Sequence, residues 1–172
     1  MKKIILVGYM GSGKTAIGKI LSRKLNIKAL DLDEIIEKKC NASISDIFKY
    51  KGEVYFRNLE HLCFKELRAN NEDMILSLGG GTPAYANNHE LLNGENTISI
   101  YLKSSVEPLF ERLRNNKKKR PIIAAMSDAE LKEFIAKSLF ERSFYYNKAT
   151  VKIDIDAKSK ENVADEICQI LS

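Results

Sequence analysis

The sequence predicts a three-layer α/β fold in which a parallel sheet of five strands lies between helices. Short, wholly apolar runs such as Ile4–Val7 and Met74–Leu78 have the composition of strands that are buried on both faces of a parallel sheet. Segments with helical periodicity separate these runs, as in successive βαβ units. The chain has 172 residues, of which 44% are hydrophobic, so it is long enough for one domain, 1–172, with a substantial core.

Strands and helices are predicted to alternate along the whole chain. An apolar or alternating run marks each of the predicted strands: Ile4–Val7, Lys28–Leu32, Met74–Leu78, Thr97–Leu102 and Thr150–Ile155. A helix follows the first strand through Leu25, and an amphipathic helix, Ser159–Leu171, closes the chain. We find no internal repeat and no linker, which favours a single domain.

Two segments look like insertions on this core. The first, Asp33–Arg68, is mostly helical, with breaks predicted near Asn41–Ser43 and Lys51–Gly52. The second is a polar and basic loop around Asn115–Ala125, which Pro121 interrupts.

Capping boxes predict where a helix begins on each side of the basic loop. Ser104 with Glu107, and Ser127 with Glu130, have the S-x-x-E spacing in which the serine and the glutamate satisfy each other's backbone N–H groups. We expect the second of these helices to run toward Tyr146.

Charge and composition limit the class of partner. The net charge of +5 suits nucleotides, phosphates, carboxylates, nucleic acid or acidic lipid. The longest apolar run, near Ile4–Met10, is far shorter than the ~20 residues that span a bilayer, and too short for a signal peptide. The widely spaced Cys40, Cys63 and Cys168 argue against a disulfide framework or zinc site and favour a reducing compartment. We expect a cytoplasmic monomer that binds neither membranes nor nucleic acid.

The stretch Gly8–Gly18, GYMGSGKTAIG, has the pattern of a phosphate-binding loop, or P-loop. It matches G-x-x-x-x-G-K-[ST], follows an apolar strand and precedes a helix. Its glycines would let backbone N–H groups turn inward as an anion nest at the positive end of the helix dipole. Lys14 would reach the β- and γ-phosphates, and the Thr15 hydroxyl would ligate Mg²⁺. The predicted nucleotide-binding residues here are Gly11, Ser12, Gly13, Lys14, Thr15 and Ala16. The alternative is a glycine-rich turn with an incidental lysine.

Asp31 and Asp33 follow the second predicted strand, at the sheet edge where open parallel sheets bind ligands. Alternation along a strand would put both carboxylates on one side. One could hold the Mg²⁺-bound water, and the other could accept a proton from a hydroxyl group. Alternatively, Asp33 is the N-cap of the helix that follows.

Three glycines and an arginine suggest a second ligand. Gly79, Gly80 and Gly81 follow the third strand and would let a ligand approach the backbone closely, unless they form a plain turn. Arg57 and Glu60 share one helix face, so the glutamate could orient the guanidinium toward another carboxylate. A weak surface ion pair is the alternative for these two residues.

Further basic residues lie later in the chain. The run Lys117–Arg120 fits a lid that closes on phosphates, with Arg120 stabilising the transferring charge. A solvated loop and a nucleic-acid patch are the alternatives, although no aromatic residues interleave the lysines. Arg142, near the end of the following helix, could be a second anion clamp or a solvated surface charge.

As an ordered set, these motifs resemble the shikimate kinases, within the nucleoside-monophosphate-kinase-like group of P-loop folds. The resemblance covers nearly the whole chain and rests on GYMGSGKT at Gly8–Thr15, DLD at Asp31–Asp33, FRNLE at Phe56–Glu60, LGGG at Leu78–Gly81, RP at Arg120–Pro121 and ER at Glu141–Arg142. It implies sheet order 2-3-1-4-5, a helical substrate-binding insertion at about 33–60 and a lid at about 112–125. It also implies ATP-dependent phosphorylation of the 3-hydroxyl of shikimate, on the route to chorismate and the aromatic amino acids.

The resemblance further implies a role for each site residue. Asp33 would be the base, and Lys14 and Arg120 would be the other catalytic residues. Arg112 would contact the adenine side and Arg120 both substrates. Thr15 and Asp31 would form the Mg²⁺ side. The residues expected to bind shikimate are Asp33, Arg57, Gly79, Gly80, Gly81 and Arg142.

Other functions stay open on the sequence alone. A kinase of gluconate or of a nucleotide would share the P-loop, but Asp33 with two arginines and the glycine run disfavours it. A regulatory P-loop module that has lost turnover is another alternative, but Lys14, Thr15, Asp33 and Arg120 are all present, so nothing marks an inactive site. A nucleic-acid binder would show a steep salt dependence of binding.

Overall fold

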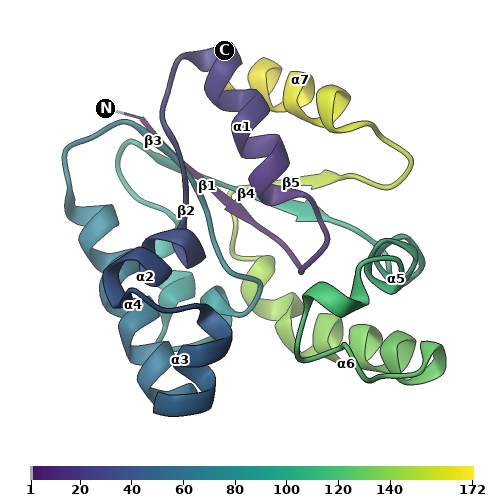
Figure 1. Cartoon of the computed structure of the whole chain (residues 1–172). Coiled ribbons are helices and arrows are strands. Elements are labelled where there is room, and N and C mark those ends of the chain that lie inside the picture. The colour runs from purple at the N-terminus through teal and green to yellow at the C-terminus, as the bar shows by residue number, and fades with distance from the viewer. Residues whose placement is uncertain (1) are drawn as a thin grey trace.

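A five-stranded parallel sheet forms the centre of the computed structural model, which describes residues 2–172 apart from the side chain of Lys119 (Figure 1). Its strands are β1 Lys3–Val7, β2 Ala29–Asp31, β3 Met74–Ser77, β4 Thr97–Lys103 and β5 Val151–Asp154. They lie in the order β2-β3-β1-β4-β5, and every neighbouring pair is parallel. The predicted fold class and strand order are confirmed.

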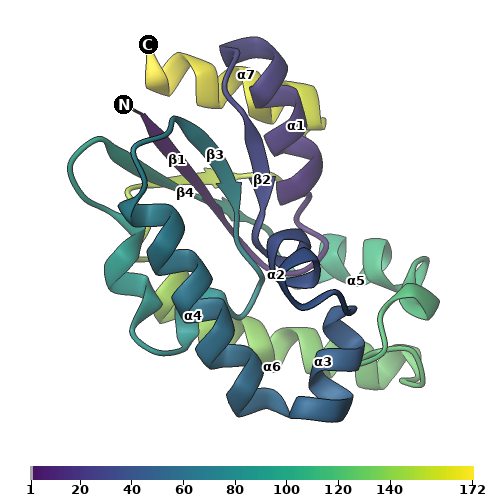
Figure 2. The same cartoon turned by 60° about the vertical axis from the view of Figure 1, so that its left-hand side comes forward.

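Helices cover both faces of this sheet. They are α1 Lys14–Leu25, α2 Leu32–Cys40, α3 Ile44–Lys51, α4 Glu53–Ala69, α5 Val106–Arg114, α6 Asp128–Tyr146 and α7 Lys160–Leu171. Helices α1 and α7 lie side by side on one face, and α2, α4 and α6 lie on the other (Figures 1 and 2). Short 3₁₀ turns, η1 Thr82–Ala84, η2 Asn88–Leu92 and η3 Lys117–Lys119, complete the connections.

The central strand β1 shows why the sequence forms three layers. Ile4 and Leu6 belong to the core beneath α1 and α7, whereas Ile5 and Val7 belong to the core beneath α2, α4 and α6. Each of these side chains is at most 1% exposed. A strand with this continuous apolar sequence therefore buries both of its faces, as parallel sheets require.

The first insertion consists of α2, α3 and α4, and its helices break where the sequence predicts. Asn41 ends α2 in the left-handed conformation, with φ 48°. Gly52 has φ 85° between α3 and α4, a conformation that glycine adopts without steric cost. The insertion packs beside β2 and reaches the C-terminal ends of the strands (Figure 2).

One predicted capping box is wrong and the other is confirmed. Ser127 and Glu130 cap α6 reciprocally. Helix α5, however, begins at Val106 after Ser105, and no side chain in the described part of the chain caps it. The hydroxyl of Ser104 instead donates to Asp156 Oδ1 at 2.6 Å. A carboxylate from the loop after β5 thus takes the serine away from the helix terminus.

Within residues 2–172, none of the helices has both the length and the apolar character needed to cross a membrane.

Candidate active site

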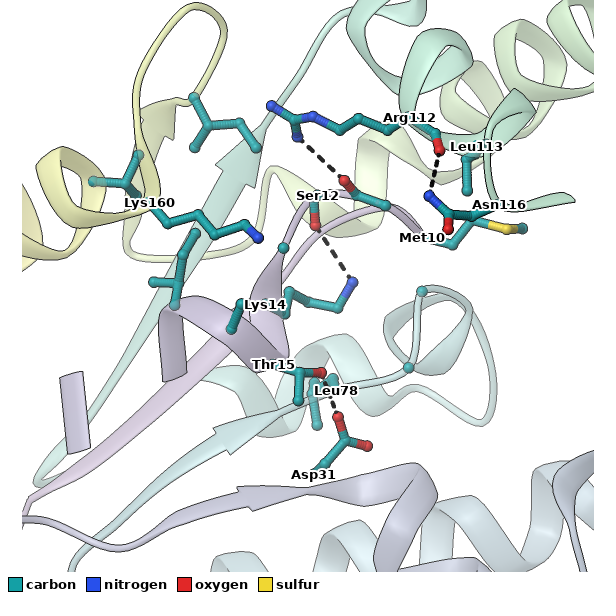
Figure 3. Close-up of a pocket in the computed structure, with 18 of the residues that line it drawn as sticks. Met10, Ser12, Lys14, Thr15, Asp31, Leu78, Arg112, Leu113, Asn116 and Lys160 are labelled. Carbon is teal, nitrogen blue, oxygen red and sulfur yellow. Dashed lines mark hydrogen bonds between the residues drawn. The ribbon is translucent and has the colours of Figure 1, made fainter. Parts of the chain in front are cut away.

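A cavity of about 930 Å³ opens at the C-terminal ends of the strands (Figure 3). The predicted site residues that line it are Gly11, Ser12, Gly13, Lys14, Thr15, Ala16, Asp31, Asp33, Gly79, Gly80, Arg112 and Arg120. Arg57, Gly81 and Arg142 are not part of this lining, but they lie directly behind the glycine loop that forms one wall. The topology therefore gathers residues from most of the chain at one edge of the sheet, as open parallel sheets do.

The P-loop presents backbone N–H groups to this cavity. Gly11 and Gly13 have φ 83° and 88°, in the left-handed region that favours glycine. Gly13 is the N-cap of α1 and supplies no side-chain cap, and the first turn of α1 contains no acidic residue. The first N–H groups of α1 are therefore left to bind an anion, which the helix dipole favours.

Lys14 folds back over the P-loop. Its Nζ donates to the carbonyl oxygens of Gly8 and Tyr9 at 2.6 and 2.9 Å. Burial lowers the pKa of Lys14 to about 8, although the carboxylates of Asp33 and Asp31 oppose this effect. Lys14 forms no ion pair within residues 2–172, so hydrogen bonds such as these two are what the amine exchanges when it turns toward a phosphate.

Asp31 joins the P-loop to the start of α2. Thr15 Oγ1 donates to Asp31 Oδ2 at 2.7 Å (Figure 3). Asp31 Oδ1 accepts from the backbone N–H groups of Asp33 and Glu34, so Asp31 is the N-cap of α2. The two residues predicted on the Mg²⁺ side are thus in direct contact.

Asp33 is correctly placed, but for a different reason than the strand pattern gives. Strand β2 ends at Asp31 and α2 begins at Leu32, so the alternation argument is wrong. The alternative in which Asp33 caps the helix is also wrong, because Asp31 does so. Burial, together with the charges of Asp31 and Glu60, raises the pKa of Asp33 to about 6. Asp33 thus lines the cavity, and its carboxyl group holds a proton more tightly than an ordinary aspartate does.

Each of the three successive glycines leaves room for a different site side chain. A Cβ on Gly79 would lie 3.3 Å from Asp33 Oδ1, and one on Gly80 would lie 3.5 Å from Arg142 Nη1. A Cβ on Gly81 would lie only 2.7 Å from Arg57 Nη2, closer than any real contact. The loop is glycine-rich because protein side chains pack against its backbone, in addition to any ligand.

Arg57 and Glu60 form a buried pair. Arg57 Nη1 lies 2.8 Å from Glu60 Oε1, and the Glu60 side chain is 1% exposed. Thr82 Oγ1 donates to the other Glu60 oxygen at 2.6 Å. The alternative of a weak surface ion pair is therefore wrong, because a buried pair of this kind holds the guanidinium in a fixed position.

Arg142 lies against an aromatic ring instead of a carboxylate. Its guanidinium carbon lies 5.5 Å from the centre of the Tyr9 ring. The Tyr9 hydroxyl is buried without a hydrogen-bond partner within residues 2–172. Tyr146, one helical turn after Arg142, donates its hydroxyl to the carbonyl of Gly80. Among the described residues no carboxylate forms an ion pair with Arg142, so its charge is available to a ligand.

The lid connects α5 to α6. The first residues of the predicted segment, Arg112–Arg114, are the last turn of α5, and the connection itself follows them. Arg112 Nη1 donates to the carbonyl of Gly11 at 3.1 Å (Figure 3). Arg120 lines the cavity from the lid, whereas Lys117 donates to the carbonyl of Met126 and holds the loop together.

Sequence reasoning missed the start of α7, which forms the far wall of the cavity. Lys158, Ser159 and Lys160 line it, and the stem of Lys160 lies 3.8 Å from where a Gly13 Cβ would be. Lys160 faces the P-loop in Figure 3. The only sequence signal was the helix start at Ser159, which predicts a cap and says nothing of a ligand.

The fold and this cavity define a P-loop kinase. A phosphate cradle lies at the start of α1, and Asp33 lies beside a glycine loop against which Arg57 and Arg142 pack. The comparisons with known proteins agree. A family model described as shikimate kinase matches residues 10–172. A shikimate kinase from Flavobacterium johnsoniae is 52% identical over 172 residues, with both chains fully covered. One from Flavobacterium psychrophilum is 52% identical over 171 residues, covering 99% of each chain.

Solved structures give the same result. A shikimate kinase from Bacteroides thetaiotaomicron has a TM-score of 0.91 and 34% identity, covering 99% of this chain and 98% of its own. One from Acinetobacter baumannii, in complex with shikimate, has a TM-score of 0.88 and 32% identity, covering 99% and 93%. A gluconokinase from Sinorhizobium meliloti, at 16% identity and a TM-score of 0.58, shares the fold alone.

The chain belongs to the shikimate kinase family. It is an ATP-dependent kinase of shikimate and acts in aromatic amino-acid biosynthesis.

Proposed function

We propose that Asp33 is the base that activates the 3-hydroxyl of shikimate. The hydroxyl oxygen forms a bond to the γ-phosphorus of ATP, the bond from that phosphorus to the bridging oxygen breaks, and the hydroxyl proton passes to Asp33. The products are shikimate 3-phosphate and ADP. The observation that carries this proposal is the position of Asp33, which lines the same cavity as the P-loop and lies beside Gly79 on its wall. A pKa of about 6 suits a base that works near neutral pH.

The same proposal assigns the substrate-binding contacts. Arg57 and Arg142 hold the carboxylate of shikimate, and the loop Gly79–Gly81 lets its ring approach the backbone closely. Both guanidinium groups pack against this loop, one at Gly81 and one at Gly80. Converging cations on one side and a carboxylate for hydroxyl groups on the other match a small ring that carries both functions.

On the donor side, the P-loop and two cations align the phosphates. The N–H groups of the P-loop and the start of α1 hold the phosphates, Lys14 turns to the γ-phosphate, and Arg120 closes over it from the lid. Arg112 flanks the adenine side. Phosphoryl transfer needs alignment and charge neutralisation more than covalent help, so these contacts supply most of the rate.

The proposed Mg²⁺ site is formed by Thr15 and Asp31. A hydroxyl and a carboxylate oxygen, 2.7 Å apart at the edge of the cavity, are the hard oxygen ligands that Mg²⁺ prefers, and Mg²⁺ keeps several waters in such sites. When bound, Mg²⁺ would neutralise charge on the β- and γ-phosphates.

We also propose a cytoplasmic monomer with ATP and shikimate as its partners. The substrate-binding insertion is about 33–60 and the lid about 112–125. Cys40, Cys63 and Cys168 are free thiols, as a reducing compartment favours. The net charge of +5 is suited to anionic substrates and needs no nucleic acid or lipid surface.

Coupled ADP release tests this proposal. The purified chain, with Mg²⁺ and ATP, is supplied with shikimate, gluconate, AMP, CMP or no acceptor, and the product is assigned by phosphorus–proton NMR couplings. We expect turnover with shikimate alone and a phosphate on the 3-oxygen. A phosphate on another oxygen would contradict the placement of Asp33. Faster turnover with gluconate would contradict shikimate as the acceptor, and faster turnover with AMP or CMP, which have no carboxylate, would contradict the carboxylate clamp.

A further inference from the structure

Tyr85 is a side chain to which neither the sequence motifs nor the mechanism above gives a role. It directly follows η1, and its ring centre lies 4.0 Å from the guanidinium carbon of Arg57. Cation–π contacts extend to about 6 Å, so this contact is close. Tyr85 is 38% exposed, and its ring therefore shields one face of the arginine from solvent while remaining at the surface.

The other sides of Arg57 are also occupied. Glu60 Oε1 lies 2.8 Å from Nη1, and Glu53 Oε1 lies 3.6 Å from Nε, which forms no hydrogen bond within residues 2–172. The backbone of Gly81 lies against Nη2. The hydrogen bond that the guanidinium forms within the described part of the chain uses Nη1, so Nη2 retains its donors for a ligand.

Tyr85 is itself held in this position. Its hydroxyl donates to Glu53 Oε1 at 3.1 Å, and Glu53 Oε1 is the same oxygen that faces Arg57 Nε. The backbone N–H of Tyr85 donates to the carbonyl oxygen of Thr82, and the hydroxyl of Thr82 donates to Glu60 Oε2. The ring, the two glutamates and the guanidinium thus form one connected group of contacts.

We propose that Tyr85 is a positioning residue, which fixes the plane of the Arg57 guanidinium so that its remaining N–H groups face the carboxylate of the acceptor. This inference rests on the proposed role of Arg57. The face of a ring attracts a cation without taking up one of its N–H donors. Two glutamates already lie against Arg57, and a third carboxylate in this place would cancel the charge that the acceptor needs. A ring restrains the guanidinium and leaves that charge intact.

The test compares Tyr85→Leu with Tyr85→Phe, with Tyr50→Leu as the matched control because Tyr50 is 70% exposed on α3. We expect Tyr85→Leu to raise the KM for shikimate about fivefold, while kcat and the KM for ATP stay within about twofold. Tyr85→Phe keeps the ring and should stay within about twofold of the wild type. An equal loss in Tyr85→Phe would overturn the role of the ring, and Tyr85→Met replaces the leucine variant if that one does not fold.

A double-mutant cycle separates this inference from the function on which it rests. In the Arg57→Ala background, Tyr85→Leu should have no further effect on the KM for shikimate, because the ring acts through the guanidinium. If Arg57→Ala alone leaves that KM unchanged, the proposed role of Arg57 is wrong. If Arg57→Ala raises KM but Tyr85→Leu does not, or raises it equally in both backgrounds, the inference about Tyr85 is wrong and the proposed function stands.

Discussion

The two ends of the cavity are built in different ways. The donor end is built around one contiguous stretch, Gly8–Ala16, in which backbone N–H groups and a helix terminus are proposed to face the phosphates. The acceptor end instead collects the side chains of Asp33, Arg57 and Arg142 from α2, α4 and α6 around the glycine loop that follows β3. Backbone groups survive most substitutions, whereas side chains do not. Substitutions at the acceptor end should therefore weaken the binding of shikimate while ATP still binds.

The largest effect is expected at the donor end. Lys14→Met removes the only side chain of the P-loop that carries a positive charge to the γ-phosphate, so kcat should fall by about a thousandfold or more. Shikimate should still bind, and isothermal titration would measure this. Lys19→Met, an exposed change on the same helix, is the control. Turnover of Lys14→Met within tenfold of the wild type would contradict the role of this lysine.

Substitutions at the acceptor end should raise the KM for shikimate. Arg142→Ala is expected to raise the KM for shikimate by about ten- to a hundredfold, because this guanidinium has no carboxylate partner of its own within residues 2–172 and its charge is free for the ligand. The KM for ATP should change little. Arg23→Ala, at an exposed position on α1, is the control. An unchanged KM for shikimate would show that Arg142 does not contact the carboxylate.

The pH profile should report one group from each end. Asp33 must be ionised to accept a proton, and burial raises its pKa to about 6, so kcat/KM for shikimate should fall about tenfold per unit below pH 6. Lys14 must be charged, and its pKa is lowered to about 8, so kcat/KM for ATP should decline above pH 8. Kinetics in one buffer series would measure both limbs. A flat profile from pH 5 to 7 would exclude Asp33 as the base.

The smallest effect is on stability. The folded-state pKa of Asp33 lies above the ordinary value of 3.8, so the folded chain holds the proton more tightly than the unfolded one between these values. The stabilisation is full below pH 3.8 and is lost as the pH rises through about 6. Asp33→Asn should therefore unfold in urea with a free energy on the order of 2 kcal/mol higher than the wild type at pH 7.5. The two proteins should converge at low pH. A less stable variant at pH 7.5 would contradict the cost of ionising Asp33.

The donor end could be predicted from the sequence more completely than the acceptor end. The P-loop, from Gly8 to Thr15, could be predicted because the residues that form its anion-binding turn lie within one contiguous motif. The strands and helices were predicted within a residue or two, since both faces of the sheet are buried and the pattern is strong. At the acceptor end, Asp33 was placed at the correct edge although the strand argument for it is wrong, because α2 starts one residue earlier, at Leu32.

Contacts between distant segments could not be predicted. Ser104 lies next to a helix and has the spacing of a cap, but Asp156, far along the chain, takes its hydroxyl. The stacking of Tyr85 on Arg57 depends on where the loop after β3 meets α4, and a single tyrosine carries no local signal. The same holds for Lys160, which reaches the P-loop only because α7 packs beside α1.

The most direct test of the division between the two ends uses Asp33→Asn, because Asp33 is the group proposed to act between them. Isothermal titration would give the affinities for Mg²⁺-ATP and for shikimate, and coupled ADP release would give kcat. We predict both affinities within about fivefold of the wild type and a kcat lower by at least about a hundredfold. Near-normal turnover, or loss of ATP binding together with shikimate binding, would contradict the claim that the ends bind separately and meet at this carboxylate.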